Sequence, residues 1–371
     1  MKKLLILVVA LILSLSVLLV GCGSNKKAEG NGSTGDKKLK IVYYANGSKG
    51  DKSFFDSADA GLKEIEKKFG AETKYIEGGV DERKWLPALE DLSAEDWDII
   101  IVGTWQLKEP LEKIAKENPD KKYIIFDAEA DYAKYGLKNV YSITYKQNEG
   151  SFLAGALAAK VTTSSMPQAN KEKTLGFVGG MDTPVINDFL VGYIQGAKHA
   201  VPDIKVLTSY IGDFANSPKG KEMALAQYNR GADIIFQVAS QAGLGALDAA
   251  KEANKYAIGV DSDQTLMYAE SDVTKANLIL NSVLKRVDNS LVRAIDLELQ
   301  GKLPWGKAES LGIQEGAIGI CDNEFYTKNV AQDIRDYVKD LETKVSKGEI
   351  KIESAMGMDT SKLNEIRNSV K

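Results

Sequence analysis

Polar and aromatic residues follow directly after several apolar, strand-like runs of this chain, where they could hold a small ligand. These segments run over Asn46 to Asp56, Gly103 to Trp105, Asp127, Gly179 to Met181 with Phe189 beyond them, Ala239 to Gly243, and Asp261 to Gln264. Carboxylates accept hydrogen bonds, amides donate and accept them, and aromatic rings offer flat faces. The set favours the binding of a small molecule.

Residues for catalysis, metal binding or cofactor binding do not cluster in the sequence. The single histidine, His199, ends a helix-like stretch, where a cation complements the carboxyl end of a helix. Gly243 and Gly245 open a Gly-x-Gly pattern, but Asp248 stands where a dinucleotide-binding loop needs a third small residue. Gly47 to Ser53 does not complete a phosphate-binding loop. We therefore expect no catalytic residue, no metal and no cofactor, and we expect that the protein is not an enzyme.

The elements that must position the candidate residues alternate along the chain in a regular order. Runs rich in isoleucine and valine, such as Ile99 to Val102 and Ile234 to Phe236, alternate with amphipathic segments such as Phe54 to Phe69. Strands with near-continuous apolar sequence are typical of parallel sheets that helices cover on both faces. The carboxyl ends of such strands form the ligand crevice. The pattern predicts an α/β fold with two doubly wound parallel-sheet lobes.

The length of the chain also indicates two lobes. Removing a leader of 21 residues from the 371 leaves 350, which is more than one hydrophobic core usually organises. We predict that lobe 1 comprises 39–146 plus about 266–304, and lobe 2 comprises 147–265 plus about 305–371. Several strands would then connect the lobes and form a hinge.

The amino terminus has the pattern of an export signal. Lys2 and Lys3 precede an apolar run that ends in Leu19-Val20-Gly21-Cys22. This ending resembles the bacterial lipobox, which implies a signal peptide over 1–21 and a lipid on Cys22. Residues 22–38, rich in Gly, Ser, Asn and Lys, would then form a flexible tether. The alternative is an uncleaved membrane helix, because the run approaches the length that spans a bilayer. The lipoprotein interpretation places the protein on the extracytoplasmic face of the cell membrane.

The charge balance and the cysteine count bear on partners and on disulfides. Without the two leader lysines, 46 Lys plus Arg face 52 Asp plus Glu, a balance of −6. This mild acidity argues against nucleic acid as a partner. Cys22 and Cys321 are the two cysteines, so a lipid on Cys22 would leave no internal disulfide. We expect a monomer.

Six segments, in order along the chain, resemble the basic membrane protein family, the nucleoside-binding lipoproteins of ABC importers. These segments are Asp51-Lys52-Ser53-Phe54, Glu149 to Gly155, Gly176 to Gly180, Gly231 to Ile235, Ile258 to Gln264 and Leu284 to Asp288. The resemblance implies the fold of type I periplasmic binding proteins, with a ligand enclosed between two lobes. It also implies an ABC permease as partner and a nucleoside, with purine preferred, as ligand.

The resemblance assigns roles to particular residues. Phe54 and Phe189 would stack on the base, since such stacking contributes roughly 1–3 kcal/mol per base, although either ring could instead be a helix core residue. Asp261 and Lys285 would bind the ribose hydroxyls, because a carboxylate accepts both hydrogens of a diol and an ammonium only donates, although Lys285 could instead lie on the surface of a helix. Asp127 matches another pocket carboxylate of the family, and Asp51, in one of the matching segments, and Asn46 also belong to the predicted site. We further expect the backbone of Gly243 to approach the ligand, as glycine permits.

Departures from the family pattern leave the preferred base open. Asn46 stands where relatives commonly have an aspartate, and Phe55-Asp56 replaces Asn-Gln. An amide donates and accepts, whereas an ionised carboxylate only accepts. Trp105 either enlarges the aromatic surface around the base or fills the lobe.

Three alternative functions stay open at this point. The same fold could act as a ligand sensor for a membrane partner, or could bind a sugar or an autoinducer, because fold alone does not fix the ligand. An extracellular nucleoside hydrolase would need clustered carboxylates, for which Asp261 and Asp263 could be mistaken.

Overall fold

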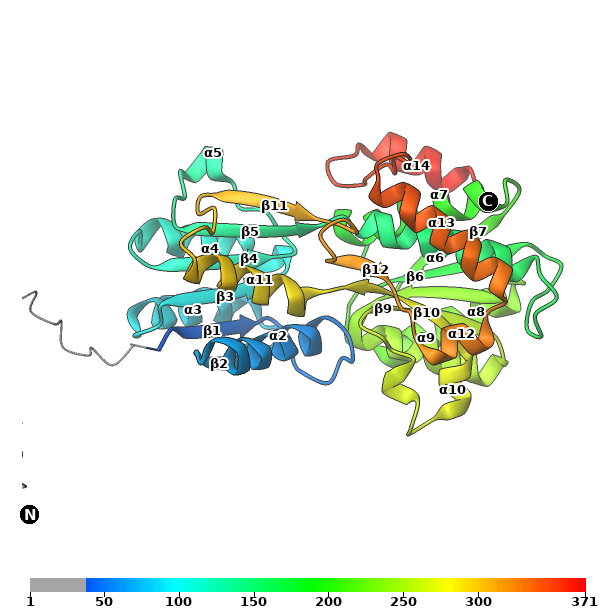
Figure 1. Cartoon of the computed structure of the whole chain (residues 1–371), viewed down its shortest axis with the longest axis horizontal. Coiled ribbons are helices and arrows are strands. Elements are labelled where there is room, and N and C mark those ends of the chain that lie inside the picture. The colour runs from blue at the N-terminus through cyan, green and yellow to red at the C-terminus, as the bar shows by residue number, and fades with distance from the viewer. Residues whose placement is uncertain (1–37) are drawn as a thin grey trace, which may run out of the picture. The chain divides into compact units, whose positions relative to one another are not determined.

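The computed structural model describes residues 38–371, of which 39–371 form one compact unit. This unit contains two α/β lobes, each built around a six-stranded sheet (Figure 1). The predicted α/β class with two doubly wound lobes is confirmed. The signal peptide 1–21, the lipidation site Cys22 and all of the tether 22–38 except its last residue lie outside the described residues.

The sheet of the first lobe is fully parallel, with the strand order β11-β5-β4-β3-β1-β2. Its strands are β1 (Lys40–Ala45), β2 (Glu72–Glu77), β3 (Ile99–Gly103), β4 (Lys122–Phe126), β5 (Val140–Tyr145) and β11 (Lys307–Leu311). The central strand β3 is buried along its whole length, as its unbroken apolar sequence requires.

Helices cover both faces of this first sheet. One face carries α2 (Phe54–Phe69) and α11 (Val287–Leu299), and the other carries α3 (Trp85–Ala94) and α4 (Lys108–Glu117). Shorter helical elements of this lobe are η1 (Glu82–Lys84), η2 (Trp105–Leu107) and α5 (Tyr132–Tyr135). Helix α2 presents Leu62 and Ile65 to the core and ends at Gly70, which takes a left-handed conformation with φ 68°. Its orientation places Phe54, at its amino end, beside the crevice.

The sheet of the second lobe has the order β12-β10-β9-β8-β6-β7, and only β12 runs antiparallel to its neighbour. Its strands are β6 (Thr174–Gly179), β7 (Lys205–Tyr210), β8 (Ile234–Val238), β9 (Tyr256–Asp261), β10 (Ile279–Lys285) and β12 (Ile318–Ile320). The first five strands are parallel, so their carboxyl ends meet at one edge.

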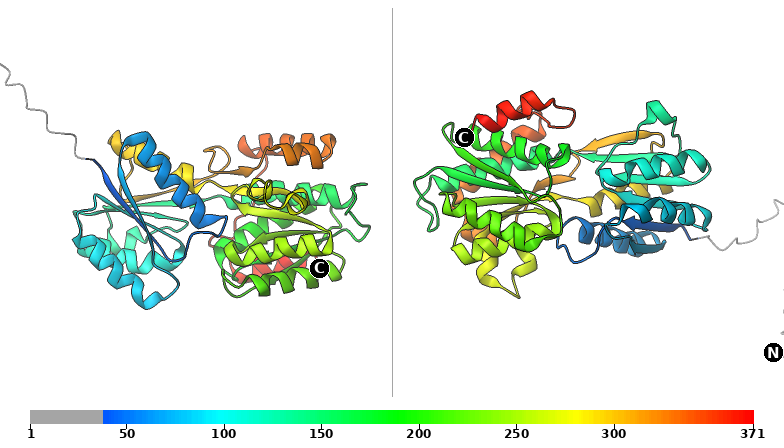
Figure 2. Two further views of the ribbon diagram at one scale, coloured as in Figure 1. Left: turned by 90° about the horizontal axis from the view of Figure 1, so that it is seen from below. Right: turned by 180° about the vertical axis from the view of Figure 1, so that it is seen from behind.

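Helices also cover both faces of the second sheet. One face carries α6 (Gln147–Thr162), α7 (Pro184–Ala200), α13 (Gln332–Ser346) and α14 (Thr360–Asn368), with α13 on α6 and α14 on α7 (Figure 2). The other face carries α8 (Ser217–Asn229), α9 (Ser240–Ala253) and α10 (Val273–Leu278), and η3 (Leu266–Tyr268) and α12 (Glu324–Asn329) complete the lobe. A Cβ on Gly155 of α6 would lie 2.0 Å from the Tyr193 carbonyl oxygen of α7. The glycine therefore permits close packing of the two helices.

Three chain segments connect the lobes, from β5 to α6, from β10 to α11 and from β11 to β12 (Figure 1). The segments are hydrogen-bonded to one another. The Lys146 N–H donates to the Leu311 carbonyl at 2.9 Å, and the Arg286 N–H donates to the Ala317 carbonyl at 2.8 Å. The predicted multi-strand hinge is therefore present.

Sheet membership differs from the predicted lobe boundaries in the segment 266–311. Strand β10 belongs to the second sheet, although 266–304 was expected in lobe 1, and β11 belongs to the first sheet, although it lies beyond residue 304. The β10 sequence pairs with β9, whereas the chain crosses to lobe 1 only at Arg286. Strand β11 reads Lys-Ala-Glu-Ser-Leu, so no apolar run marked it as a strand.

Within residues 38–371, no helix is both long enough and apolar enough to cross a bilayer.

Candidate ligand-binding site

A cavity of about 490 Å³ lies between the two lobes, where the loops that follow the parallel strands meet. It is lined by eight of the nine residues predicted to bind ligand: Asn46, Asp51, Phe54, Trp105, Asp127, Phe189, Asp261 and Lys285. Residues from both lobes contribute, as expected where the carboxyl ends of parallel strands face each other. Gly243, the ninth, is not among the lining residues.

Backbone strain is concentrated around this cavity. Among the described residues other than glycine, seven have a positive φ, and five of them lie in the loops at the cavity or at the ends of the elements beside these loops: Lys52, Thr104, Asp127, Ser240 and Asp261. Such conformations cost on the order of 1–3 kcal/mol each and cluster at functional sites. Asp127 directly follows β4, and Asp261 is the last residue of β9. The strain therefore aims both carboxylates away from the direction of the sheet.

Lys285 forms the electrostatic centre of the site. It ends β10 in the second lobe, and its Nζ lies 2.6 Å from Asp127 Oδ1 of the first lobe. The ammonium and the carboxylate are both largely shielded from water, so the pair interacts strongly but depends on each partner. Its Nζ also lies 5.0 Å from the centre of the Phe189 ring and 5.7 Å from that of Phe54. Lys285 thus joins the two lobes across the cavity.

Asp261 is a buried carboxylate that ionises near neutral pH. Burial raises the pKa of Asp261 to about 6, while the Lys285 ammonium and the Ser53 hydroxyl lower it, and Asp51 and Asp127 raise it further. The Ser53 Oγ donates to Asp261 Oδ2 at 2.5 Å, and Ser53 belongs to the first lobe. The carboxylate keeps acceptor capacity for a ligand hydroxyl.

Asp51 lines the cavity but holds its own loop. Its carboxylate accepts hydrogen bonds from the N–H groups of Ser53, Phe55 and Asp56, and from the Ser240 hydroxyl of the second lobe at 2.8 Å. Burial raises the pKa of Asp51, although these hydrogen bonds lower it in part. Because these donors already occupy both oxygens, the geometry favours a role in ordering the loop and joining the lobes.

Asn46 has one polar atom that a ligand could satisfy. Its Nδ2 donates to Thr104 Oγ1 at 2.8 Å and to Gln106 Oε1 at 3.1 Å, while its buried Oδ1 has no hydrogen-bond partner. A buried acceptor without a donor costs about 1–3 kcal/mol. The site therefore favours a ligand that brings an N–H or O–H to this oxygen.

The two predicted stacking rings differ in how accessible they are. Phe54 is 8% exposed and Phe189 only 1% exposed, and both also belong to the hydrophobic cores of their lobes. The Phe189 ring packs against Phe236, with centroids 6.2 Å apart, and faces the Lys285 ammonium. Phe189 is therefore mainly a core residue that supports the wall of the cavity.

Two further aromatic residues line the cavity that the sequence reasoning did not assign, namely Phe55 and Phe214. Both are half-buried. Each ring lies against the backbone of a glycine that follows the first strand of its lobe: a Cβ on Gly47 would lie 2.3 Å from Phe55, and a Cβ on Gly180 would lie 2.3 Å from Phe214. The glycines that follow these strands, Gly47 and Gly180, were the available signal. Phe214 offers the more accessible ring of the second lobe.

Trp105 of the first lobe and Asp213 of the second lobe also line the cavity. Trp105 is 42% exposed, so it enlarges the aromatic surface at the cavity and does not fill the lobe. Asp213 accepts hydrogen bonds from the N–H groups of Ala215 and Asn216, and thereby fixes the loop that carries Phe214. The Phe214 carbonyl in turn accepts a hydrogen bond from the Ala242 N–H at the start of α9.

Gly243 packs against a side chain of its own lobe. A Cβ at this position would lie 1.7 Å from Gln237 Oε1. The expectation that its backbone approaches the ligand is therefore replaced by a different role, which is to leave room for the Gln237 amide.

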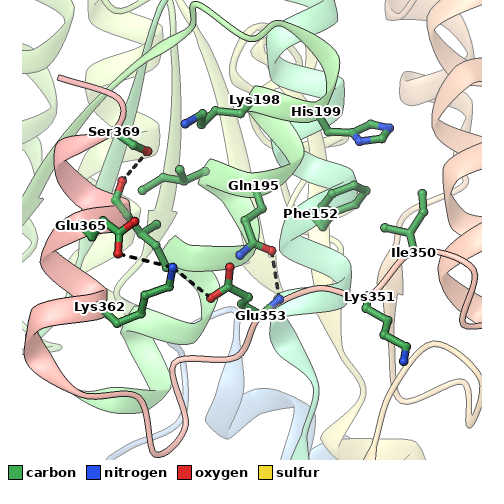
Figure 3. A pocket seen from close by; sticks show the side chains of 12 residues that line it. Phe152, Gln195, Lys198, His199, Ile350, Lys351, Glu353, Lys362, Glu365 and Ser369 are labelled. Carbon is green, nitrogen blue, oxygen red and sulfur yellow. Dashed lines mark hydrogen bonds and ion pairs between the residues drawn. The ribbon is translucent and has the colours of Figure 1, made fainter.

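A second cavity, of about 450 Å³, lies on the second lobe between α6, α7 and the carboxyl-terminal segment (Figure 3). His199 lies at its edge with its ring 5.5 Å from that of Phe152, and Lys362 pairs with Glu353 and Glu365. Lys198, His199 and Lys351 point in different directions (Figure 3). The residues in this cavity therefore do not converge on one ligand group. Residues 38–371 also contain no cluster of three or more His, Cys, Asp or Glu that could hold a metal ion.

The chain is similar to known substrate-binding proteins. The family model described as ABC transporter substrate-binding protein PnrA-like matches residues 38–355. The chain is 32% identical over 369 residues to the ABC transporter nucleoside-binding protein BmpA of Lactococcus lactis, which covers 95% of this chain and 100% of that relative. It is 30% identical over 350 residues to basic membrane protein A of Borreliella burgdorferi, covering 94% and 95% of the two chains.

A solved structure supports the fold. The ABC transporter solute-binding protein from Aeropyrum pernix superimposes with a TM-score of 0.78 at 24% identity, covering 89% of this chain and 98% of that one. The names of the family and of both relatives refer to substrate-binding or membrane proteins and to no catalytic activity. The resemblance inferred from the sequence is confirmed, and the chain belongs to the family of PnrA-like ABC transporter substrate-binding proteins.

Proposed function

We propose that the protein captures a nucleoside, preferably a purine nucleoside, between its lobes and delivers it to an ABC permease. One observation carries the proposal: a single cavity combines aromatic rings with two carboxylates and an ammonium, contributed by both lobes. The name of the Lactococcus lactis relative, a nucleoside-binding protein, supports the same ligand class.

The base would stack between Phe54 of the first lobe and Phe214 of the second. Both rings line the cavity, and Phe214 is more accessible than Phe189. Asn46 would accept a hydrogen bond from the base through its free Oδ1. A purine with an N–H on this edge satisfies the oxygen, whereas a ligand without a donor leaves it unpaired, which is costly.

The ribose would bind to Asp261, Asp127 and Lys285. A carboxylate can accept from both hydroxyls of a vicinal diol, while an ammonium donates to their oxygens. The described cavity lining holds four aspartates and one lysine, Lys285. A phosphate group would therefore meet net negative charge, which favours nucleosides over nucleotides.

The protein would work outside the cytoplasm as a lipoprotein, anchored through Cys22 after removal of residues 1–21. The basic start, apolar run and Leu-Val-Gly-Cys ending of the sequence support this part of the proposal. Radiolabelled palmitate incorporation that disappears in a Cys22→Ser variant would test it.

Calorimetry with inosine, guanosine, adenosine, uridine, ribose and AMP tests the ligand. We expect heat with purine nucleosides and at least tenfold weaker binding of AMP. Absence of binding by every nucleoside would refute the proposal. Phe214→Leu should weaken nucleoside binding by about tenfold or more, in line with roughly 1–3 kcal/mol for stacking.

Phe189→Leu is the matched control for the stacking assignment. This change should lower the unfolding temperature, because the ring is buried in the core, with a smaller effect on affinity. If Phe189→Leu weakens nucleoside binding more than Phe214→Leu does, the stacking ring of the second lobe is Phe189 and not Phe214.

A further inference from the structure

Two buried glutamines of the second lobe form a hydrogen-bonded pair that reaches across to the first lobe. Gln237, in β8, and Gln264, just after β9, are both fully buried. The Gln237 Nε2 donates to Gln264 Oε1 at 2.7 Å, and the Gln264 Nε2 donates to the Lys52 carbonyl of the first lobe at 3.1 Å. Neither glutamine lines the ligand cavity.

The orientation of the pair is fixed entirely by the second lobe. The Ala239 N–H donates to Gln237 Oε1 at 3.2 Å, which leaves the Gln237 Nε2 to donate to Gln264. The Val260 N–H also donates to Gln264 Oε1, at 3.2 Å. Since two donors hold this oxygen, the Nε2 of Gln264 must face the Lys52 carbonyl.

Two glycines make room for this pair. A Cβ on Gly243 would lie 1.7 Å from Gln237 Oε1, and a Cβ on Gly259 would lie 2.6 Å from Gln264 Oε1. Lys52, whose carbonyl receives the final bond, has a positive φ of 51°. The neighbouring Ser53 donates to Asp261 in the cavity. The glutamine pair therefore contacts the same loop that completes the binding site.

We propose that Gln264, oriented by Gln237, is a positioning residue for lobe closure. When the lobes close, the Gln264 Nε2, already oriented by the second lobe, donates a hydrogen bond to the Lys52 carbonyl. This bond places Ser53 against Asp261. When the lobes separate, the bond breaks and the Gln264 Nε2 loses its acceptor. The pair thereby stabilises the closed form and slows ligand release, whichever ligand is bound.

Hydrogen exchange of the full chain, without added ligand, tests the proposal independently of the nucleoside assignment. In Gln264→Met, amides of peptides that cover residues 51–57 should exchange about tenfold faster than in the unchanged protein. Tenfold corresponds to roughly 1.4 kcal/mol, the size expected of one buried hydrogen bond. Release of inosine, followed by tryptophan fluorescence to which Trp105 at the cavity contributes, should accelerate by a similar factor. Absence of inosine binding in the unchanged protein would count against the proposed function and leave the exchange result standing.

Gln227→Met is the matched control. Gln227 is also a buried glutamine beside a glycine, because a Cβ on Gly176 would lie 2.3 Å from its Oε1. Its Nε2, however, donates only within the second lobe, to the Phe177 carbonyl and the Ser209 hydroxyl. This variant should be less stable than the unchanged protein, but the amides of residues 51–57 should not exchange faster. If Gln264→Met behaves like Gln227→Met, the pair only supports the fold and the proposal is wrong. Should Gln264→Met not fold, Gln237→Met removes the donor that orients Gln264 and leaves the interlobe bond partners in place, and unchanged exchange at 51–57 in that variant would equally overturn the proposal.

Discussion

Asp261 should make ligand affinity and fold stability change with pH in opposite directions. Its pKa is about 6 in the folded protein, against 3.8 for a carboxyl group in water. A raised carboxyl pKa means that ionisation opposes folding, so the contribution to stability is most favourable below about pH 4 and is lost as pH rises through 6. The ligand hydroxyls, in contrast, require the ionised carboxylate as an acceptor.

The magnitudes follow from linkage between these two pKa values. Ionisation of Asp261 should cost about 3 kcal/mol of folding free energy at pH 7.5 and roughly half as much at pH 5. Asp261→Asn removes this pH-dependent cost, so the stability difference between the variant and the unchanged protein should shift by roughly 1 kcal/mol between the two pH values. Nucleoside affinity of the unchanged protein should fall about tenfold from pH 7.5 to pH 5, because roughly nine-tenths of Asp261 is then protonated.

Urea unfolding and calorimetry at both pH values would measure these effects. The comparison cancels other titrating groups, because they are present in both proteins. A stability difference between Asp261→Asn and the unchanged protein that stays constant within about 0.5 kcal/mol would refute the reasoning from burial. Affinity independent of pH in this range would show that the carboxylate does not bind the ligand.

Two further predictions concern packing and charge in the lobes. Lys285→Met should lower the free energy of unfolding by about 3–5 kcal/mol in urea, because Asp127 would remain buried without its partner. A loss below about 1 kcal/mol would contradict a strong interlobe pair. Gly155→Ala should lower the free energy of unfolding by at least about 1–3 kcal/mol, because the new methyl group would meet the Tyr193 carbonyl of the packed helix α7. An unchanged melting temperature, measured by circular dichroism, would show that the two helices can move apart without cost.

Much of the fold could be predicted from the sequence, because apolar runs such as β3 mark central parallel strands by composition alone. The polar edge strand β11 could not be recognised. It is placed by pairing with β5 and by Glu309, which accepts hydrogen bonds from Tyr141 and Arg293. These contacts bring together residues that lie far apart in the chain, so no local pattern signals them.

The candidate site shows a similar division. The strand-end rule accounts for seven of the eight predicted residues that line one cavity, because parallel strands bring their carboxyl ends together, whereas Lys285 was predicted only from the family resemblance. It could not tell Phe189 from Phe214. Both follow strands of the second lobe, and only the packing of α7 shows that Phe189 is enclosed by the core while the Asp213 loop leaves Phe214 accessible.

The four carboxylates that line the cavity have two different roles, and this explains how the site can be rigid and still accept a ligand. Asp51 and Asp213 accept hydrogen bonds from backbone N–H groups of their own loops, so these loops are ordered without a ligand. Asp127 and Asp261 have left-handed backbones that aim their oxygens toward Lys285 and the other lobe. A loop that is already ordered loses little conformational freedom when ligand binds, so more of the contact energy appears as affinity. Residue type alone could not assign these roles, because all four are aspartates in strand-end loops.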